Sequence, residues 1–389
     1  MAALPQWQFK VSGRGAHEAA YEITDRENPE DLGQGHENQD DEEWEALLWE
    51  AHGDVGLTPG IRFKAGRQII SWGESNYARI LDILNPRDMT RPGLMELEDA
   101  RIPVAAMRLS AQGKKFSLEA VSIHQNPGDK ISGLGGDFDA FAPFRSPGLP
   151  VKIKEKDRES ARLDPETYAI KLKHAHSGGD INLVAARSLD TAPVLTYAGK
   201  DHLGYAVLEP VFEPMTLLGL SATQALGSTL FKWEGVFRWD RAVQRKDIIQ
   251  QSLFPGATPA TVKGFEKRDQ METLVGLEYT GMENLVLVLE GKCLYTLDHT
   301  ENLATEETLS QTYAQANYKM WNDTLEWEVF WVWMDPGKGH ILRLSGEYAF
   351  TDHLFLKVGV AFYDAATDQA MVHPYRDMDR LFSRLTICF

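Results

Sequence analysis

Apolar and polar side chains alternate with a period of two residues over much of this chain. Between Leu325 and Trp333 every odd-numbered residue is apolar, whereas the even-numbered set begins with Glu326 and Glu328. Successive side chains of a β-strand point to opposite faces, so this pattern predicts a strand with one apolar face. The same alternation recurs in segments that begin at Trp7, Phe231, Leu342 and Leu354.

The connections between the predicted strands alternate between tight turns and longer polar links. The tight turns fall at residues 56–60, 112–114, 177–179, 226–227, 281–284, 322–323 and 351–353. The links fall at residues 25–42, 73–100, 125–163, 190–204, 242–270, 296–308, 335–339 and 364–377. This spacing predicts about sixteen antiparallel strands.

Soluble β-sandwiches also alternate, but short turns at one end and long loops at the other are typical of bacterial transmembrane barrels. We therefore predict one all-β domain over residues 1–389, a closed transmembrane antiparallel β-barrel of about sixteen strands. Its short turns would face the periplasm.

Composition disfavours nucleic acid as a partner, and the length of the apolar runs excludes membrane-spanning helices as the fold. The formal net charge of −17 argues against nucleic acid, because phosphate binding relies on basic surfaces. The longest apolar run, from Val329 to Met334, is far shorter than the roughly 18 to 20 residues of a spanning helix. Ten tryptophans fit a barrel, in which aromatic residues gather at the membrane interfaces.

The two ends of the sequence bear on export. The chain begins Met1-Ala2-Ala3-Leu4-Pro5 and enters a strand-like segment at Trp7, without a signal-peptide pattern. We interpret it as a mature chain with an added initiator methionine, located in the bacterial outer membrane. The terminal Phe389 resembles the signal that the barrel-assembly machinery reads, so that machinery is an expected partner.

Three blocks of sequence resemble a family of proteobacterial outer-membrane barrels, catalogued as domain of unknown function 1302. They are Gly66-Arg67-Gln68 with Ser71-Trp72-Gly73-Glu74-Ser75, then Asn85-Pro86 with Arg91-Pro92-Gly93, and Tyr375-Arg376-Asp377-Met378-Asp379-Arg380. The resemblance implies a barrel fold and a role in transport or export. It also implies an envelope transporter of lipids or hydrophobic compounds as a partner.

Residues 73–100 form the most informative link, because loops longer than about 15 residues are usually functional or disordered. Tyr77, Ile80, Leu81, Ile83 and Leu84 are spaced for one face of a helix, which Asn85-Pro86 would end. An apolar link needs burial, so we expect it to fold into the lumen and narrow the pore.

The acidic end of this link is expected to face basic residues of the lumen wall, so that opposed charges order polar solutes in a transverse field. Alternatively, these charges are ordinary wetted side chains and the link only seals the top of the barrel. The residues assigned to the lumen or constriction are Arg62, Lys64, Glu96, Glu98, Asp99, Lys171, Lys173, Lys232, Arg238, Arg343 and Lys357.

Two other links carry weaker signals. The link with Phe138, Phe141 and Phe144 would bind hydrophobic cargo or, in the plainer interpretation, pack onto neighbouring loops. The acidic residues of link 25–42 are expected to form a solvated face, or to reach lipopolysaccharide phosphates through divalent cations.

Enzyme motifs are absent from the sequence: it has no Gly-Xaa-Ser-Xaa-Gly elbow, zinc-binding helix, paired Cys-Xaa-Xaa-Cys or phosphate loop. His124, His174, His176 and His202 would need to meet near a serine to support catalysis. We expect no enzyme activity, no metal and no cofactor.

Three functions remain, in this order: an outer-membrane transport channel, either porin-like or moving hydrophobic and amphipathic compounds; a plugged structural or partner-binding barrel; and a barrel enzyme. Expected partners are the lipid bilayer and lipopolysaccharide.

Overall fold

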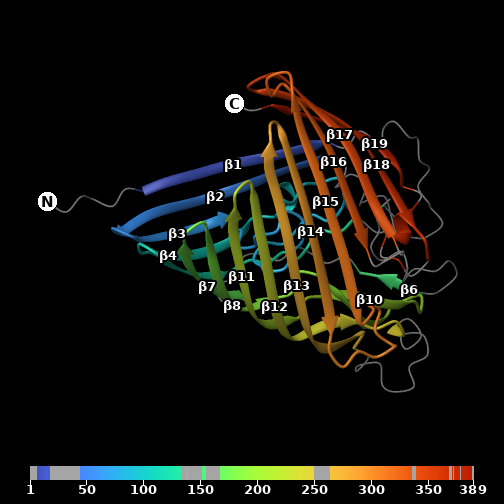
Figure 1. The fold of residues 1–389 in the computed structure, drawn as a ribbon. Coiled ribbons are helices and arrows are strands. Elements are labelled where there is room, and N and C mark those ends of the chain that lie inside the picture. Colours follow the sequence, from blue (N-terminus) through green and yellow to red (C-terminus); the bar gives the residue numbers. More distant parts are fainter. Residues whose placement is uncertain are drawn as a thin grey trace.

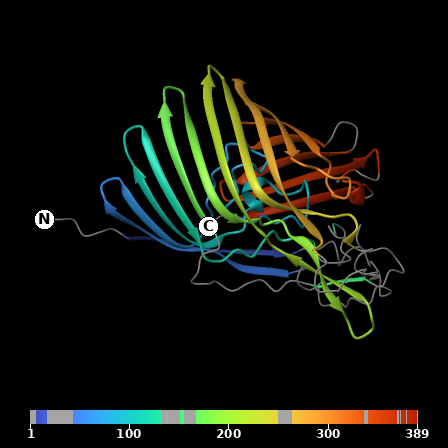
Figure 2. The same ribbon diagram turned by 90° about the horizontal axis from the view of Figure 1, so that it is seen from below.

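Sixteen antiparallel strands form one curved sheet, in which each strand pairs with the next one along the chain (Figures 1 and 2). The computed structural model describes residues 7–17, 44–132, 138, 151–154, 167–248, 263–334, 339–367, 370, 372–376 and 378–387. Several parts of the sequence predictions therefore lie outside the described residues, namely link 25–42, residues 335–338, Phe141, Phe144 and Phe389.

The strands of this sheet are β1 (Trp7–His17), β2 (Trp44–Thr58), β3 (Ile61–Gln68), β4 (Val104–Gln112), β5 (Phe116–Ile123), β7 (Thr167–His176), β8 (Gly179–Leu189), β11 (Pro214–Leu226), β12 (Thr229–Gln244), β13 (Phe265–Met282), β14 (Leu285–Thr296), β15 (Thr308–Met320), β16 (Leu325–Met334), β17 (Gly339–Thr351), β18 (Leu354–Ala365) and β19 (Arg380–Ile387). Hydrogen-bonded ladders run from β1 to β19, and the described residues include no ladder between these two end strands. The predicted all-β barrel fold of sixteen antiparallel strands is confirmed, and a hydrogen-bonded closure between β1 and β19 stays a prediction.

Alternating side chains face opposite sides of the sheet, as the pattern predicts. On β16, Trp327 is 51% exposed and Val329 45%, whereas Glu328 is 5% exposed and Phe330 7%. On β13, Met271 and Val275 are exposed while Leu274 is fully buried. Apolar side chains therefore cover the outer face of the barrel, and the inner face carries the charged ones.

Each predicted tight turn joins two neighbouring strands. Several of these turns need a residue in the left-handed region of backbone conformation, which asparagine, aspartate and glycine adopt most readily. Asn284 has φ of 61°, Asn322 has φ of 55° and Gly227 has φ of 62°. The turns therefore bring the polypeptide straight back into the sheet at one end of the barrel.

A second, three-stranded sheet lies at the other end of the barrel (Figure 1). The sequence pattern does not predict it: two of its strands fall within the predicted links 125–163 and 190–204, and the third follows the second of these links. It consists of β6 (Val151–Ile153), β10 (Ala206–Val211) and β9 (Val194–Lys200), and it buries its own small core with Leu195, Leu208 and Ile248. These strands are too short for a period of two to stand out from the surrounding links.

The chain between β3 and β4, residues 69–103, lies inside the curved sheet, where Figure 2 shows its blue and teal trace; we call it the inward segment. Ile80 and Leu81 have no exposed surface, and they belong to a core that also contains inward-facing residues of the wall. The predicted burial of this link is confirmed.

The predicted helix over residues 77–84 is wrong. These residues form bends, and the one helix of the segment is the single turn α3 (Leu97–Ala100). Backbone N–H groups that a helix would pair internally instead bind side chains, for example Leu81 N with Glu234 at 3.1 Å. Carboxylates of the wall thus compete successfully with helical hydrogen bonding. No helix among the described residues is long and apolar enough to cross a membrane.

Candidate lumen constriction

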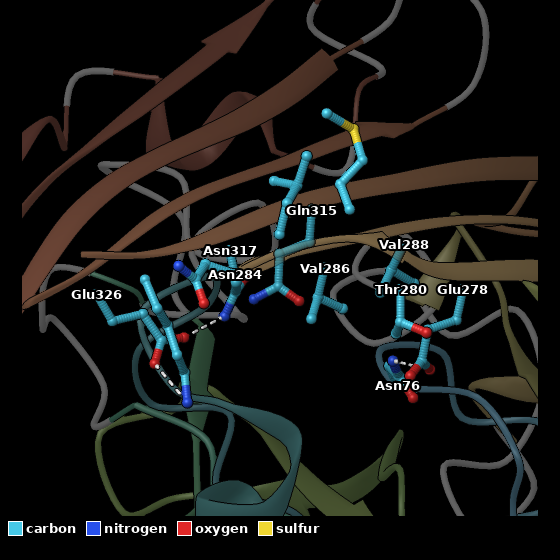
Figure 3. Close-up of a pocket in the computed structure, with 12 residues that line it drawn as sticks. Asn76, Glu278, Thr280, Asn284, Val286, Val288, Gln315, Asn317 and Glu326 are labelled. Carbon is cyan, nitrogen blue, oxygen red and sulfur yellow. Dashed lines mark hydrogen bonds and ion pairs between the residues drawn. The ribbon is translucent and has the colours of Figure 1, made fainter. Parts of the chain in front are cut away.

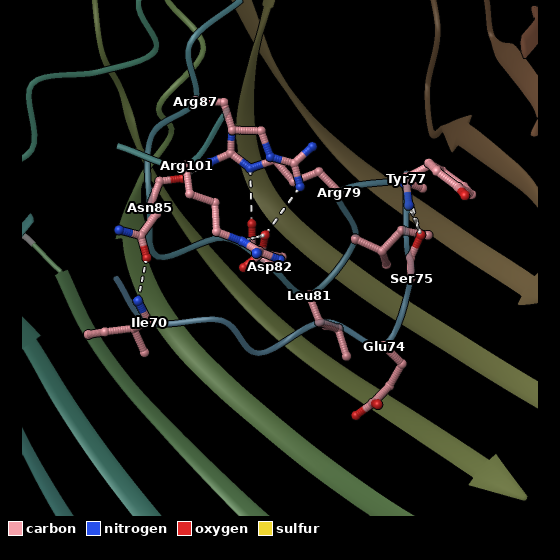
Figure 4. A network of polar contacts seen from close by, with 12 residues as sticks. Ile70, Glu74, Ser75, Tyr77, Arg79, Leu81, Asp82, Asn85, Arg87 and Arg101 are labelled. Carbon is pink, nitrogen blue, oxygen red and sulfur yellow. Dashed lines mark hydrogen bonds and ion pairs between the residues drawn. The ribbon is translucent and has the colours of Figure 1, made fainter. Parts of the chain in front are cut away.

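Asn85 holds together the two ends of the inward segment. Its side-chain oxygen accepts a hydrogen bond from the Ile70 backbone N–H at 2.8 Å, and its amide nitrogen donates to the Ile102 carbonyl at 2.8 Å (Figure 4). Asn85 is 1% exposed, so these bonds form away from water. They close the neck of the segment where it leaves β3 and returns to β4.

A buried ionic cluster stabilises the same region (Figure 4). Asp82 accepts hydrogen bonds from Arg101 at 2.8 Å and from Arg87 at 3.3 Å. Arg79 reaches out of the segment to both carboxylate oxygens of Asp129 at 3.1 Å. Burial, together with the positive charge of Arg79, lowers the pKa of Arg87 to about 10. A pKa of about 10 leaves the Arg87 guanidinium charged at neutral pH, so it can pair with Asp82.

Glu234 of β12 is the principal anchor between the wall and the segment. Its carboxylate accepts backbone N–H groups of Glu74 at 2.6 Å, Ser75 at 2.8 Å and Leu81 at 3.1 Å, and Glu234 has no exposed surface. Gly219 of neighbouring β11 makes room for Leu81, because a Cβ there would lie 2.2 Å from Leu81 Cδ2. The wall therefore matches the segment in both hydrogen bonding and shape.

Glu290 of β14 anchors the next residues of the segment. It accepts hydrogen bonds from the Ser75 hydroxyl at 2.5 Å and from the Asn76 backbone N–H at 2.9 Å. Lys232 of β12 donates to the Asn76 side chain at 2.8 Å. Tyr77 then stacks on Tyr313, with ring centroids 5.9 Å apart.

The later part of the segment binds β17 and β18. Arg343 donates to the Gly93 carbonyl at 3.0 Å, and Lys357 donates to Glu96 at 2.6 Å. Both cations also bind Glu328, Arg343 at 2.6 Å and Lys357 at 3.3 Å. Burial opposes ionisation of Glu96, but the hydrogen bond and charge of Lys357 outweigh it and lower the pKa of Glu96.

Asp99 connects the segment to both end strands of the sheet. Its carboxylate accepts a hydrogen bond from Arg384 of β19 at 2.6 Å, and its carbonyl accepts one from Arg14 of β1 at 3.0 Å. Earlier in the segment, Trp72 donates its indole N–H to Glu119 of β5, and Glu74 accepts from Asn182 of β8 at 2.9 Å. The segment is therefore attached to strands from β1 to β19 and spans the lumen.

Most residues that the sequence assigns to the lumen contact the segment or its anchors. The bonds described above bring five of them into contact with the segment: Arg343, Lys357, Glu96, Asp99 and Lys232. Arg238 donates to the Ile80 carbonyl at 3.0 Å and binds Glu272 at 2.6 Å. The Lys171 ammonium lies 5.4 Å from the ring centre of Trp72.

The four other assigned residues lie away from these bonds. Lys173 pairs with Asp180 at 2.7 Å, and Arg62 pairs with Asp54 at 3.0 Å near the tight-turn end of the barrel. Lys64 is half-buried on β3, and Glu98 is exposed on the segment. Arg62 also donates to the side-chain oxygen of Gln8 at 3.4 Å, so both Arg62 and Lys173 bind side chains of the wall and not the segment.

Sequence reasoning missed the anchors Glu234 and Glu290. The alternation along β12 and β14 places both side chains on the inner face, but nothing in the sequence links Glu234 to Ser75, which is 159 residues away. Asn85, which the sequence assigns only to a helix end, is likewise a buried cross-link.

A cavity of about 390 Å³ lies against the inner wall, between the segment and the tight-turn end of β13 to β16 (Figure 3). Asn76 contributes to it from the segment. Figure 3 places Asn76, Glu278 and Thr280 at one end of the cavity, and Asn284, Asn317 and Glu326 at the other.

The weaker sequence signals fall outside this site. Phe138 is buried against Tyr363 and Tyr375, which agrees with the packing interpretation for that ring. The four histidines do not meet at one place: His124 lies beyond β5 and His202 between β9 and β10, whereas His174 and His176 are neighbours at the tight-turn end of β7, with ring centroids 6.4 Å apart.

Comparisons with known proteins place the chain in a family. No curated protein matches it. Similar solved structures include OccD3 (OpdP) of Pseudomonas aeruginosa, with 11% identity, TM-score 0.46, and coverage of 84% of this chain and 74% of that one. OccAB2 of Acinetobacter baumannii shows 10% identity and TM-score 0.45, covering 94% and 82%. The outer membrane channel DcaP of Acinetobacter baumannii shows 9% identity and TM-score 0.39, covering 78% and 82%. The family described as "Protein of unknown function (DUF1302)" matches residues 2–389, and the chain belongs to that family.

Proposed function

We propose that this protein is a transport channel of the bacterial outer membrane whose lumen is narrowed by the inward segment. The observation that carries this proposal is a wall with an apolar outer face and a charged inner face, to which a chain segment is fastened from within. The outer face of such a wall suits contact with lipid, and its inner face suits contact with water.

The outer face supports a membrane location. Along β14, Leu287 and Leu289 point outward and are 38% and 51% exposed, whereas Glu290 on the inner face has no exposed surface. Exposing such an apolar belt to water is unfavourable, and a bilayer removes that penalty. Sheet pairing also satisfies the backbone N–H and C=O groups, which hydrocarbon cannot do.

The number of strands supports an aqueous passage. Barrels of sixteen to eighteen strands are wide enough to leave a channel, whereas the interior of eight strands is filled by side chains. Here the inward segment occupies part of that width. The charges of Glu96 and Asp99 are paired with Lys357 and Arg384, while Glu98 is exposed. We propose that these groups and the bases around them orient polar solutes at the constriction.

A plugged, partner-binding barrel is the second candidate, and one specific observation favours it. Ile80, Leu81 and Leu84 of the segment join Leu217, Leu274 and other wall residues in an apolar core within the lumen. A dry core of this kind obstructs water and ions. In this alternative the protein serves an envelope transport system as a scaffold.

Planar lipid bilayers test the two candidates. The full chain and a variant lacking residues 75–99 are reconstituted at matched protein amounts, with folding checked by circular dichroism. The channel proposal predicts current steps from the full chain and larger steps from the deletion variant. A silent full chain with a conducting variant supports the plug. Folded but silent barrels in both cases refute the channel, and equal steps refute the constriction.

A further inference from the structure

The cavity beneath the segment has an unusual distribution of polar and apolar groups. On β14 the inner-facing residues Glu290 and Lys292 are charged, but the next two toward the tight turn, Val288 and Val286, are apolar. Figure 3 shows Val286 in the middle of the cavity beside Gln315, and Val288 next to Thr280 at the end that also contains Glu278 and Asn76. Val286 is 37% exposed. Apolar surface facing water in a lumen favours any solute that covers it.

The end of the cavity next to the segment offers both donors and acceptors. Lys232 donates to Glu278 at 2.7 Å and to Asn76 at 2.8 Å, so one carboxylate is balanced by one ammonium. Thr280 adds a hydroxyl to the lining. Because Lys232, which is 5% exposed, balances the charge of Glu278, this end gives an ionic ligand group little net attraction, whereas an uncharged hydroxyl or amide can both donate and accept.

The other end repeats this combination. Asn317 donates to Glu326 at 2.7 Å, and the Lys319 ammonium lies 3.9 Å from the Glu326 carboxylate. A carboxylate, an ammonium and an amide again stand together. Both ends of the cavity therefore favour uncharged polar groups over ions.

We propose that this cavity is a binding site for an uncharged solute with an apolar middle and hydrogen-bonding groups at both ends. The inference deepens the proposed channel function, since it names the class of solute that occupies the lumen just below the constriction. Asn76 belongs to both the segment and the cavity, so the bound solute touches the constriction directly.

Four linear probes of similar length test this assignment. Octanediol has the expected chemistry, whereas octanedioate and diaminooctane carry two negative or two positive charges on the same apolar body. Triethylene glycol keeps the hydroxyl ends but has a polar middle. In planar bilayers, added to the tight-turn side, octanediol reduces the current through the full chain in a saturable manner. The three other probes do so at least about tenfold more weakly, which corresponds to about 1.4 kcal/mol.

Variants locate the effect. Val286→Asn replaces the apolar middle with an amide and is expected to weaken the octanediol block about tenfold, a change equal to about 1.4 kcal/mol. Val286→Thr keeps the shape and should weaken it less. Ser110→Asn adds the same amide on the inner face of β4, outside the cavity, and should leave the block unchanged.

The outcomes separate this site from the channel function. A conducting barrel that all four probes block equally, or that none blocks, overturns the site and leaves the channel standing. If the full chain does not conduct, titration calorimetry of octanediol against the protein in lipid nanodiscs decides the site instead. Saturable binding that Val286→Asn weakens then supports the site although the channel has failed, and absence of binding overturns both.

Discussion

Replacing Glu234 with alanine should loosen the inward segment. The substitution removes the acceptor of three backbone N–H groups, those of Glu74, Ser75 and Leu81. A buried N–H without a partner costs about 1 to 3 kcal/mol. Even at about 1 kcal/mol each, the loss is about 3 kcal/mol, which makes opening of the segment roughly a hundredfold more frequent.

Hydrogen exchange followed by mass spectrometry measures this opening directly. Peptides from residues 69–85 of Glu234→Ala should exchange at least about a hundredfold faster than those of the unaltered chain. Glu234→Gln retains one acceptor oxygen and should lie between the two. Glu347→Ala is the matched control. It removes a carboxylate from the inner face of β17, near the tight turn and away from residues 69–85. Equal exchange in Glu234→Ala and Glu347→Ala would refute the anchoring role of Glu234.

Three further changes test other parts of the account. Gly219→Ala places a Cβ 2.2 Å from Leu81 Cδ2, so it should displace the segment and increase single-channel current; an unchanged current would contradict the packing. Leu289→Arg puts a cation on the outer face and should destabilise the barrel in lipid by about 2 to 4 kcal/mol in denaturant titrations, unless that face meets water. The pKa of Glu96 is lowered in the folded protein, so its ion pair with Lys357 stabilises the segment at neutral pH and is lost as the pH falls through that pKa. Protection factors of the amides near Glu96, which are corrected for the slower intrinsic exchange in acid, should therefore fall as the pH falls, and Lys357→Met should abolish that fall.

The barrel could be predicted because its strands and turns depend on residues that are close in sequence. In a strand that separates lipid from a polar lumen, apolar and polar side chains must alternate. A tight turn must contain residues that tolerate a left-handed backbone, as Asn284 does. Both signals appear within about ten neighbouring residues. The short strands β6, β9 and β10 escaped prediction because three to seven residues cannot show such a period clearly.

The inside of the barrel could be predicted only in outline. The apolar residues of the inward segment require burial, and this requirement placed the segment correctly in the lumen. Its conformation depends on partners far away in sequence, such as Glu234 and Glu290, which take the N–H groups that a helix would use. The spacing of Tyr77 to Leu84 wrongly predicted a helix. The acceptors that compete with helical hydrogen bonds come close to the segment only when the sheet folds around it.

Fluorescence quenching by brominated lipids tests the central claim most directly, namely that apolar side chains of the wall face lipid while the inward segment lies within. Trp331 lies on the outer face of β16, and Trp72 of the segment is 2% exposed inside the barrel. In reconstituted protein, Trp331→Phe should remove emission that bromine quenches, and Trp72→Phe should remove emission that it does not. Quenching of Trp72, or its absence at Trp331, would contradict the account.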